Sequence, residues 1–179
     1  MAVAAGAGVA QALWDVRRTR VKHIISAMVQ NEAGVLAHIS GLFAGRGFNI
    51  DSLAVGETED PEVSRMTIVA EGDEQVLEQI VKQLRKVITV IKVQDFSDGD
   101  CVERDLMLLK VNAPAARRSE IVQLVALFRA RVVDVVASEL MIELSGPEHK
   151  IDAFVSLMRP YGIKEICRTG RIAMLRGQK

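Results

Sequence analysis

The segment that decides the fold reads HIISAMVQ at residues 23–30 and continues as NEAGVL at residues 31–36. The first part is mostly apolar and predicts a buried strand. The second part begins a helix pattern, whose apolar residues recur at helical spacing: Val35, Leu36, Ile39, Leu42 and Phe43. The polar junction places Gly34 where the helix should begin.

A helix N-terminus presents unpaired backbone N–H groups and the positive end of the helix dipole, which suit a carboxylate or phosphate. Glycine at Gly34 carries no side chain that would keep a ligand away from those groups. An ordinary helix start is the alternative interpretation of these residues taken alone.

Strands and helices alternate in the same order twice along the chain. The first set comprises a strand at 21–30, a helix at 34–46, strands at 48–57 and 63–70, a helix from residue 73, and a strand at 87–95. The second set comprises a strand at 106–111, a helix at 117–130, strands at 132–137 and 140–144, a helix at 148–159, and a strand at 163–168. Residues 171–175 are a candidate extension of the sheet edge. The predicted fold is α+β, with two ferredoxin-like βαββαβ domains in tandem, each a four-stranded antiparallel sheet with both helices on one face.

The predicted boundaries follow from composition. Residues 1–20 are expected to be a weakly ordered N-terminal arm, since their charges follow the apolar part and this order is wrong for a secretory signal. The first domain is predicted at 21–96, a polar linker at 97–103, and the second domain at 104–179.

One local match suggests duplication. Leu42-Phe43 recurs as Leu127-Phe128, 85 residues later. At that offset Ala116, Ser119 and Asp134 stand at the positions of Asn31, Gly34 and Asn49. The second domain therefore lacks all three residues, and only the first domain is predicted to bind a ligand.

Composition excludes several classes of function. Lysine plus arginine and aspartate plus glutamate number 23 each, which argues against nucleic acid as the main partner. No apolar run approaches the roughly 18 residues of a membrane span, so no membrane contact is expected. The two cysteines, Cys101 and Cys167, require no disulfide framework and favour a reducing compartment. We therefore expect a cytoplasmic protein, or one of the plastid stroma or mitochondrion if the source is a eukaryote.

Catalytic patterns are thin. His23, His38 and His149 lack partners at metal-ligand spacing, and the cysteines form no CxxC. No nucleophile elbow or phosphate-binding loop is present. The sequence predicts no catalytic residue and no metal site, and it favours binding over turnover.

Five longer segments of the chain resemble those of a known protein family. They are NEAGVLAHISGLFAGRGFNIDSLAVGETEDPEVSRMTIV at 31–69, QVLEQIVKQLRKVITVIKVQD at 75–95, VERDLMLLKVNA at 102–113, LFRARVVDV at 127–135 and RTGRIAM at 168–174. With these segments the chain resembles the small regulatory subunits of acetolactate synthase (acetohydroxyacid synthase), which begin with an ACT domain. The resemblance spans nearly all of residues 21–175 and identifies 21–96 as an ACT domain and 104–179 as an ACT-like domain.

The resemblance implies a non-catalytic partner of the catalytic (large) subunit. Thiamine diphosphate, Mg²⁺ and FAD then belong to that subunit, and this chain has no cofactor of its own. The family's small subunits activate the enzyme of branched-chain amino-acid biosynthesis and confer feedback inhibition by a branched-chain amino acid, usually valine. Their ACT domains form homodimers with the effector at the interface.

The effector-contacting positions that the resemblance implies are Asn31, Gly34, Val35, Asn49 and Ile50. These residues suit an amino acid, because backbone N–H groups at a helix start bind a carboxylate and asparagine side chains offer donors and acceptors. Ala37 stands where some relatives carry a small hydroxyl residue. The alternative is a free-standing amino-acid-sensing ACT protein that acts on another partner.

Overall fold

The structure, a computed structural model, describes residues 21–96 and 101–177. The chain divides into two compact units between residues 100 and 101. Each unit is built on four antiparallel strands and two helices, which confirms the predicted α+β fold of two tandem ferredoxin-like domains. The predicted arm at 1–20 and residues 97–100 of the predicted linker lie outside the described residues.

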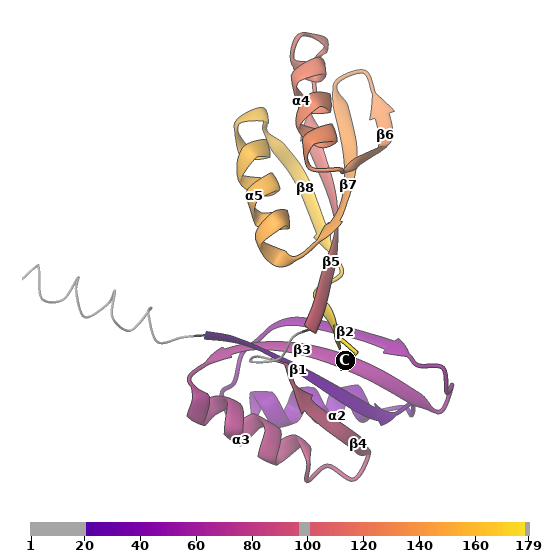
Figure 1. Cartoon of the computed structure of the whole chain (residues 1–179), viewed down its shortest axis with the longest axis vertical. Helices are drawn as coiled ribbons and strands as arrows, with labels where there is room; N and C mark the ends of the chain where they lie inside the picture. Colours follow the sequence, from indigo (N-terminus) through magenta and orange to yellow (C-terminus); the bar gives the residue numbers. More distant parts are fainter. Residues whose placement is uncertain (1–20, 97–100, 178–179) are drawn as a thin grey trace, which may run out of the picture. The chain divides into compact units, whose positions relative to one another are not determined.

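The first unit follows the predicted element order. It consists of β1 (Val21–Gln30), α2 (Val35–Ala44), β2 (Ile50–Glu57), β3 (Val63–Gly72), α3 (Glu74–Leu84) and β4 (Val90–Asp95). Its strands are ordered β2-β3-β1-β4, so β2 and β4 are the edges. Both helices cover one face of this sheet (Figure 1).

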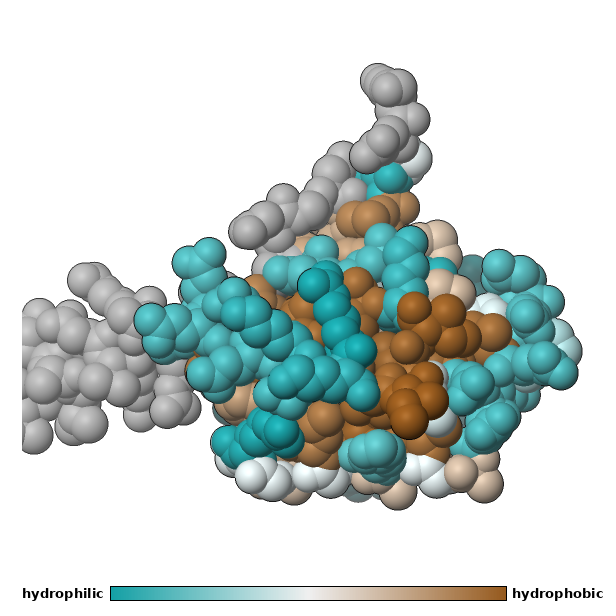
Figure 2. Space-filling view, turned by 90° about the horizontal axis from the view of Figure 1, so that it is seen from below, coloured by the Kyte–Doolittle hydropathy of each residue, from teal (hydrophilic) through white to brown (hydrophobic). Residues whose placement is uncertain are grey.

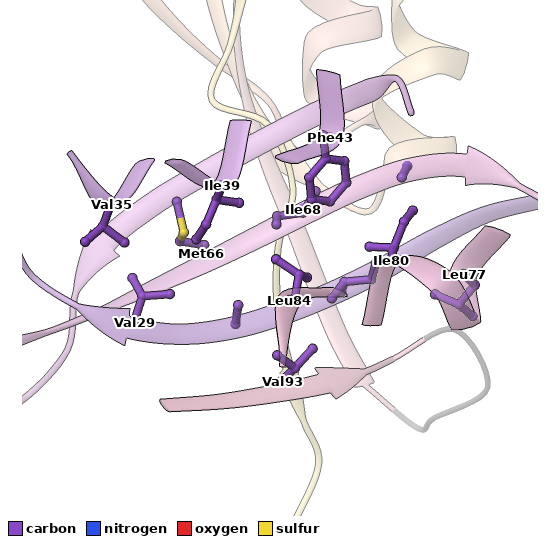
Figure 3. Close-up of a cluster of buried hydrophobic side chains, with 13 residues drawn as sticks. Val29, Val35, Ile39, Phe43, Met66, Ile68, Leu77, Ile80, Leu84 and Val93 are labelled. Atoms are coloured by element: carbon purple, nitrogen blue, oxygen red, sulfur yellow. The ribbon is translucent and has the colours of Figure 1, made fainter. Parts of the chain in front are cut away.

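The core of the first unit lies between that face and the helices. Alternate residues of β1 point toward the helices, and Ile25, Ala27 and Val29 are at most 2% exposed. Figure 3 shows Ile39 and Phe43 of α2 and Ile80 and Leu84 of α3 pointing into the same cluster. The buried side chains therefore recur at the helical spacing in α2 and α3 and at every second residue in β1, as the sequence predicts.

One strand is shorter than predicted. The β-branched run at 87–95 predicts a strand from residue 87, but β4 begins at Val90. The N–H groups of Lys86 and Val87 instead donate to the carbonyls of Gln83 and Leu84, both at 3.1 Å. Residues 85–89 therefore form a turn, because the end of α3 provides their backbone partners.

The second unit has the same arrangement with two additions. It consists of β5 (Cys101–Asn112), α4 (Ala115–Leu127), β6 (Arg131–Val136), β7 (Glu139–Gly146), α5 (Glu148–Met158), the 3₁₀ helix η1 (Arg159–Tyr161), β8 (Ile163–Arg168) and β9 (Ile172–Leu175). The strand order is β6-β7-β5-β8. β9 pairs with residues Cys101 to Arg104 of β5. The predicted linker at 97–103 is therefore wrong at its end, because β9 gives residues 101–103 a partner strand.

The internal repeat has a different register from the predicted one. A register shift precedes Val29 in the pairing of β1 with β4, and one precedes Val111 in the pairing of β5 with β8. Val111 lies 82 residues after Val29, and the buried Ile121 likewise lies 82 residues after the buried Ile39. The predicted offset of 85 is wrong, since it matches the half-buried Leu42 to a leucine that is 77% exposed.

At an offset of 82 residues, the counterparts of Asn31 and Gly34 are Ala113 and Ala116, and that of Asn49 is Arg131. The second unit therefore still lacks all three residues.

A buried carboxylate holds the end of β8 to β5. The side chain of Asp105 is 1% exposed and accepts hydrogen bonds from Arg168 Nε at 2.6 Å and Nη2 at 2.5 Å. Arg168 also donates from Nη1 to Asp152 of α5 at 3.0 Å. Burial acts to lower the pKa of Arg168, but the hydrogen bonds and charges of the two aspartates outweigh it and raise that pKa. The guanidinium is therefore fully charged and joins three elements.

A second arginine makes a parallel connection. Arg171 is 7% exposed, and its Nη1 lies 3.3 Å from Glu103 of β5 and 3.1 Å from Glu148 of α5. The segments ERD at 103–105 and RTGR at 168–171 are thus two halves of one charged cluster.

We expect Asp105→Ala to lower the free energy of unfolding of the second unit by about 3 kcal/mol, because it leaves the partly buried Arg168 with one carboxylate only. Hydrogen exchange during urea unfolding measures this for each unit separately. The control is Glu165→Ala, which breaks the exposed ion pair with Lys110 (2.8 Å) and should change little. Equal losses in both variants would contradict the assigned role of Asp105.

Candidate functional site

Asn31 ties the hairpin between β2 and β3 to the end of β1. Its Nδ2 donates to Glu57 Oε1 at 3.1 Å and to the carbonyl of Pro61 at 2.9 Å. Its Oδ1 accepts from Ser64 Oγ at 3.0 Å, and its backbone N–H donates to the carbonyl of Glu62 at 2.7 Å. Both amide hydrogens are thus used within the chain. Asn31 and Glu57 are exposed residues, and their side-chain oxygens have room to accept further hydrogen bonds, which suits an ammonium group.

Gly34 is the N-cap of α2 and has a φ of +90°. A Cβ at this position would meet nothing within 4 Å, so the backbone conformation and not the available space calls for glycine. No side chain caps the helix and no acidic residue lies in its first turn. Apart from the N–H of Val35, which donates to the carbonyl of Glu32 at 3.4 Å, the first N–H groups of α2 have no side-chain partner within the described residues and suit an anion.

Val35 differs from the other predicted site residues, because its side chain is 6% exposed and lies in the core (Figure 3). Its N–H is 3.4 Å from the carbonyl of Glu32. Any contact that Val35 makes with a ligand would therefore come from its backbone.

The remaining predicted residues lie at the start of β2. Asn49 is exposed, and its Nδ2 donates to Asp51 Oδ1 at 2.5 Å. Ile50 is half-buried and packs on the core of the first unit. A register shift between Ile50 and Ser52 marks a bulge here, which directs the side chains at the strand start.

Strand pairing places Asn49 and Ile50 far from Asn31, Gly34 and Val35. Ile50 lies opposite Ala70, which lies opposite His23 at the start of β1. Glu57 lies opposite Ser64, which lies opposite Val29 at the end of β1. At about 3.3 Å per residue, the two ends of β2 are roughly 23 Å apart.

We call Asn31, Gly34 and Val35 the helix-start group, and Asn49 and Ile50 the strand-start group. Within one chain the structure does not bring the two groups together. Glu57, which no sequence pattern singled out as a site residue, joins the helix-start group through Asn31. A contact across 26 residues leaves no local signal in the sequence.

Two family models match the chain. The one described as the small subunit of acetolactate synthase matches residues 104–177, and the one described as the AHAS small subunit-like ACT domain matches residues 25–92. Together they cover most of both units.

Similar proteins and a similar structure carry related descriptions. A probable acetolactate synthase small subunit from Archaeoglobus fulgidus is 54% identical over 89% of this chain and 99% of that protein. The acetolactate synthase small subunit from Aquifex aeolicus is 49% identical over 90% of this chain and 85% of that protein. The crystal structure of the acetolactate synthase small subunit from Thermotoga maritima is similar to this chain with a TM-score of 0.82 and 40% sequence identity. The match covers 89% of this chain and 99% of that one.

Two features are absent from the described residues. None of the helices at 21–96 and 101–177 is long and apolar enough to cross a membrane. Nor do these residues contain a group of three or more histidine, cysteine, aspartate or glutamate side chains that could hold a metal ion.

We expect Asn31→Ala to loosen the hairpin at residues 58–62, since it removes three side-chain hydrogen bonds. The local free energy of opening should fall by about 1–2 kcal/mol, as measured by hydrogen exchange. Asn49→Ala, which removes a hydrogen bond to a near neighbour only, is the control. Unchanged protection at 58–62 in Asn31→Ala would show that Asn31 does not hold the hairpin.

Proposed function

The chain belongs to the acetolactate synthase small-subunit family, and we propose that it binds the catalytic large subunit, raises its activity and confers feedback inhibition by a branched-chain amino acid, valine foremost. Thiamine diphosphate, Mg²⁺ and FAD would act on the large subunit. The observation that carries the effector part of the proposal is the position of the two residue groups at opposite ends of the edge strand β2.

A dimer resolves that separation. β2 is an edge, with Val55 47% exposed, and an edge strand offers unpaired backbone groups to a second strand. If two copies pair their β2 edges antiparallel about a two-fold axis, the start of one β2 lies beside the end of the other. The helix-start group of one chain then faces the strand-start group of its partner, and two equivalent sites form.

Each part of a free amino acid finds a matching group in such a site. The N–H groups at the start of α2 suit the carboxylate. The oxygens of Asn31 and Glu57 suit the ammonium group. The partner's strand start would contribute the polar Asn49 side chain and the apolar Ile50 side chain. Selection among valine, leucine and isoleucine should be modest, because one methylene in an apolar pocket is worth about 1–3 kcal/mol.

Regulation follows if the effector favours one arrangement of the dimer. A ligand shifts an equilibrium only by the difference between its affinities for the two states. A ligand that bridges two chains contacts both only when they are paired, so its binding favours the paired form. The large subunit would then respond to how firmly the two copies are held together.

The second candidate function is a free-standing amino-acid sensor that acts on another partner. It requires the same site, so it predicts effector binding without any effect on the large subunit. The experiment that separates the two is a reconstitution of the purified chain with the acetolactate synthase large subunit of the same organism. We expect higher activity on addition of the chain, and loss of that activity as valine is titrated. Activity that never responds to the chain would favour the sensor.

Gly34→Asp should weaken valine binding at least about tenfold, or ~1.4 kcal/mol, because the new carboxylate lies where the carboxylate of valine would bind. Gly34→Asn is the matched control, since both residues carry the same cost of a positive φ and both find open space around the Cβ. Calorimetry on both variants measures the affinity. Equal affinities would remove the helix start from the site.

Val55→Asp should dissociate the dimer, because each chain would place a new carboxylate within the paired β2 edges, where it would lose part of its contact with water. Sedimentation measures the association, and valine binding should fall in parallel with it. Ile91→Asp places the same charge on the opposite edge strand, where Ile91 is 57% exposed, and should leave the dimer intact. A dimer that survives Val55→Asp and dissociates in Ile91→Asp would assign the interface to β4.

A further inference from the structure

The turn at residues 85–89 exposes one large apolar side chain almost completely. Val87 is 7% exposed and packs inward, whereas Ile88 at the tip of the turn is 96% exposed. The N–H of Val90 donates to the carbonyl of Val87 at 3.0 Å, so the backbone on both sides of Ile88 is held in place. An isoleucine held in this way remains in water unless another surface covers it.

Ile88 forms one side of a groove between α2 and this turn. The groove has a volume of about 830 Å³. α2 lines the groove in part with the small residues Ala37 and Gly41, which leave space for an occupant close to the helix. The other residues that line the groove are His38, Leu42, Arg46, Gln83, Lys86, Val87 and Thr89. Figure 2 views the helix-covered side of the first unit and shows apolar side chains exposed in its middle with hydrophilic side chains around them.

The charge on the groove is of one sign. Arg46 and Lys86 line it, and the described residues that line it include no carboxylate. Arg46 donates from Nη2 to Gln83 Oε1 at 2.9 Å and from Nη1 to the carbonyl of Leu42 at 3.5 Å, both uncharged acceptors. Neither cation takes part in an ion pair within the part of the chain that the structure describes. Both charges are therefore available to a carboxylate from outside the chain.

A buried hydroxyl adds a further requirement. Thr89 Oγ1 is shielded from solvent and finds no hydrogen-bond partner among the described residues. A polar group buried without a partner is rare in native proteins, and here it belongs to a residue that lines the groove. Since this hydroxyl is shielded from solvent, an occupant of the groove could provide a partner only if the turn at 85–89 shifted on docking.

We propose that this groove docks a segment of the catalytic large subunit that carries an apolar side chain and at least one carboxylate. The proposal rests on the proposed function. A protein segment fits better than a small metabolite, because a molecule within the groove could not cover an isoleucine that projects from the turn. A second copy of this chain fits poorly, because its own groove would bring two further cations.

The groove and the helix-start group share one helix. Gly34 lies at the N-terminus of α2, and Ala37 and Gly41 follow on the same ten-residue helix. A partner seated against Ala37 and Gly41 would therefore contact the element whose first N–H groups would bind the amino acid. This gives the effector a direct route to the large subunit.

The test measures the affinity of the full-length chain for the large subunit of the same organism, by calorimetry. Ile88→Asp should weaken binding at least about tenfold, as loss of a central apolar anchor does. The double variant Arg46→Glu/Lys86→Glu should do the same by reversing the charge. Gly41→Gln should weaken binding by filling the groove, and a Cβ at Gly41 meets nothing within 4 Å, so this variant should fold.

The controls are Ile91→Asp and Lys92→Glu, which place the same charges on β4 outside the groove and should keep the affinity within about twofold. Valine binding to each variant alone should stay unchanged, which shows that the fold and the effector site are intact. If the groove variants bind as tightly as the controls, the groove is not the docking site, although the proposed function stands. If the unmodified chain does not bind the large subunit, both the proposed function and this inference are wrong.

Discussion

The direction and length of β2 limit what one copy of this chain can bind. The antiparallel pairing of β2 with β3 and of β3 with β1 places Ile50 level with the start of β1 and Glu57 level with its end. Since α2 begins where β1 ends, the helix-start group and the strand-start group lie at opposite ends of the sheet. A small ligand that contacts both groups must therefore join two chains, and its binding energy then depends on their association.

The two units share one arrangement of strands and helices but carry their polar and charged residues at different places. In the first, polar and glycine residues gather at the start of α2, and the hairpin is held by an asparagine side chain. In the second, the equivalent positions are Ala113 and Ala116, and the charged residues are instead collected where β5, α5 and β8 meet. The segments VERD and RTGR, distant in sequence, are explained by this one charged cluster. We infer that these ion pairs stabilise the second unit.

Much of the fold could be predicted from the sequence, because the spacing of hydrophobic residues is a local property. The order of strands and helices, the glycine helix start and the tandem repeat all followed from it. The turn at 85–89 could not be predicted, because Val87 and Ile88 are β-branched and favour a strand. In the folded chain the N–H groups of Lys86 and Val87 donate to carbonyls at the end of α3 instead. The repeat register is not apparent in the sequence, because leucine and phenylalanine recur easily, whereas burial and strand register are visible only in the folded chain.

The residues of the candidate site stay a prediction from the family resemblance. The structure adds that these residues lie near opposite ends of β2, which follows from strand pairing and is not visible in the sequence. The contact between Asn31 and Glu57 also depends on the hairpin, and it uses an amide hydrogen that the sequence alone would leave free for a ligand.

The most direct test of a site shared between two chains is complementation in a mixed dimer. Gly34→Asp chains and Asn49→Ala chains should each bind valine poorly, because every site in their homodimers carries a defect. In a heterodimer of the two, one site contains both defects and the other contains an intact Gly34 and an intact Asn49. Calorimetry on the purified heterodimer should therefore recover one tight site per dimer. If the heterodimer binds no better than either homodimer, the two residues act within the same chain and the account of the shared site is wrong.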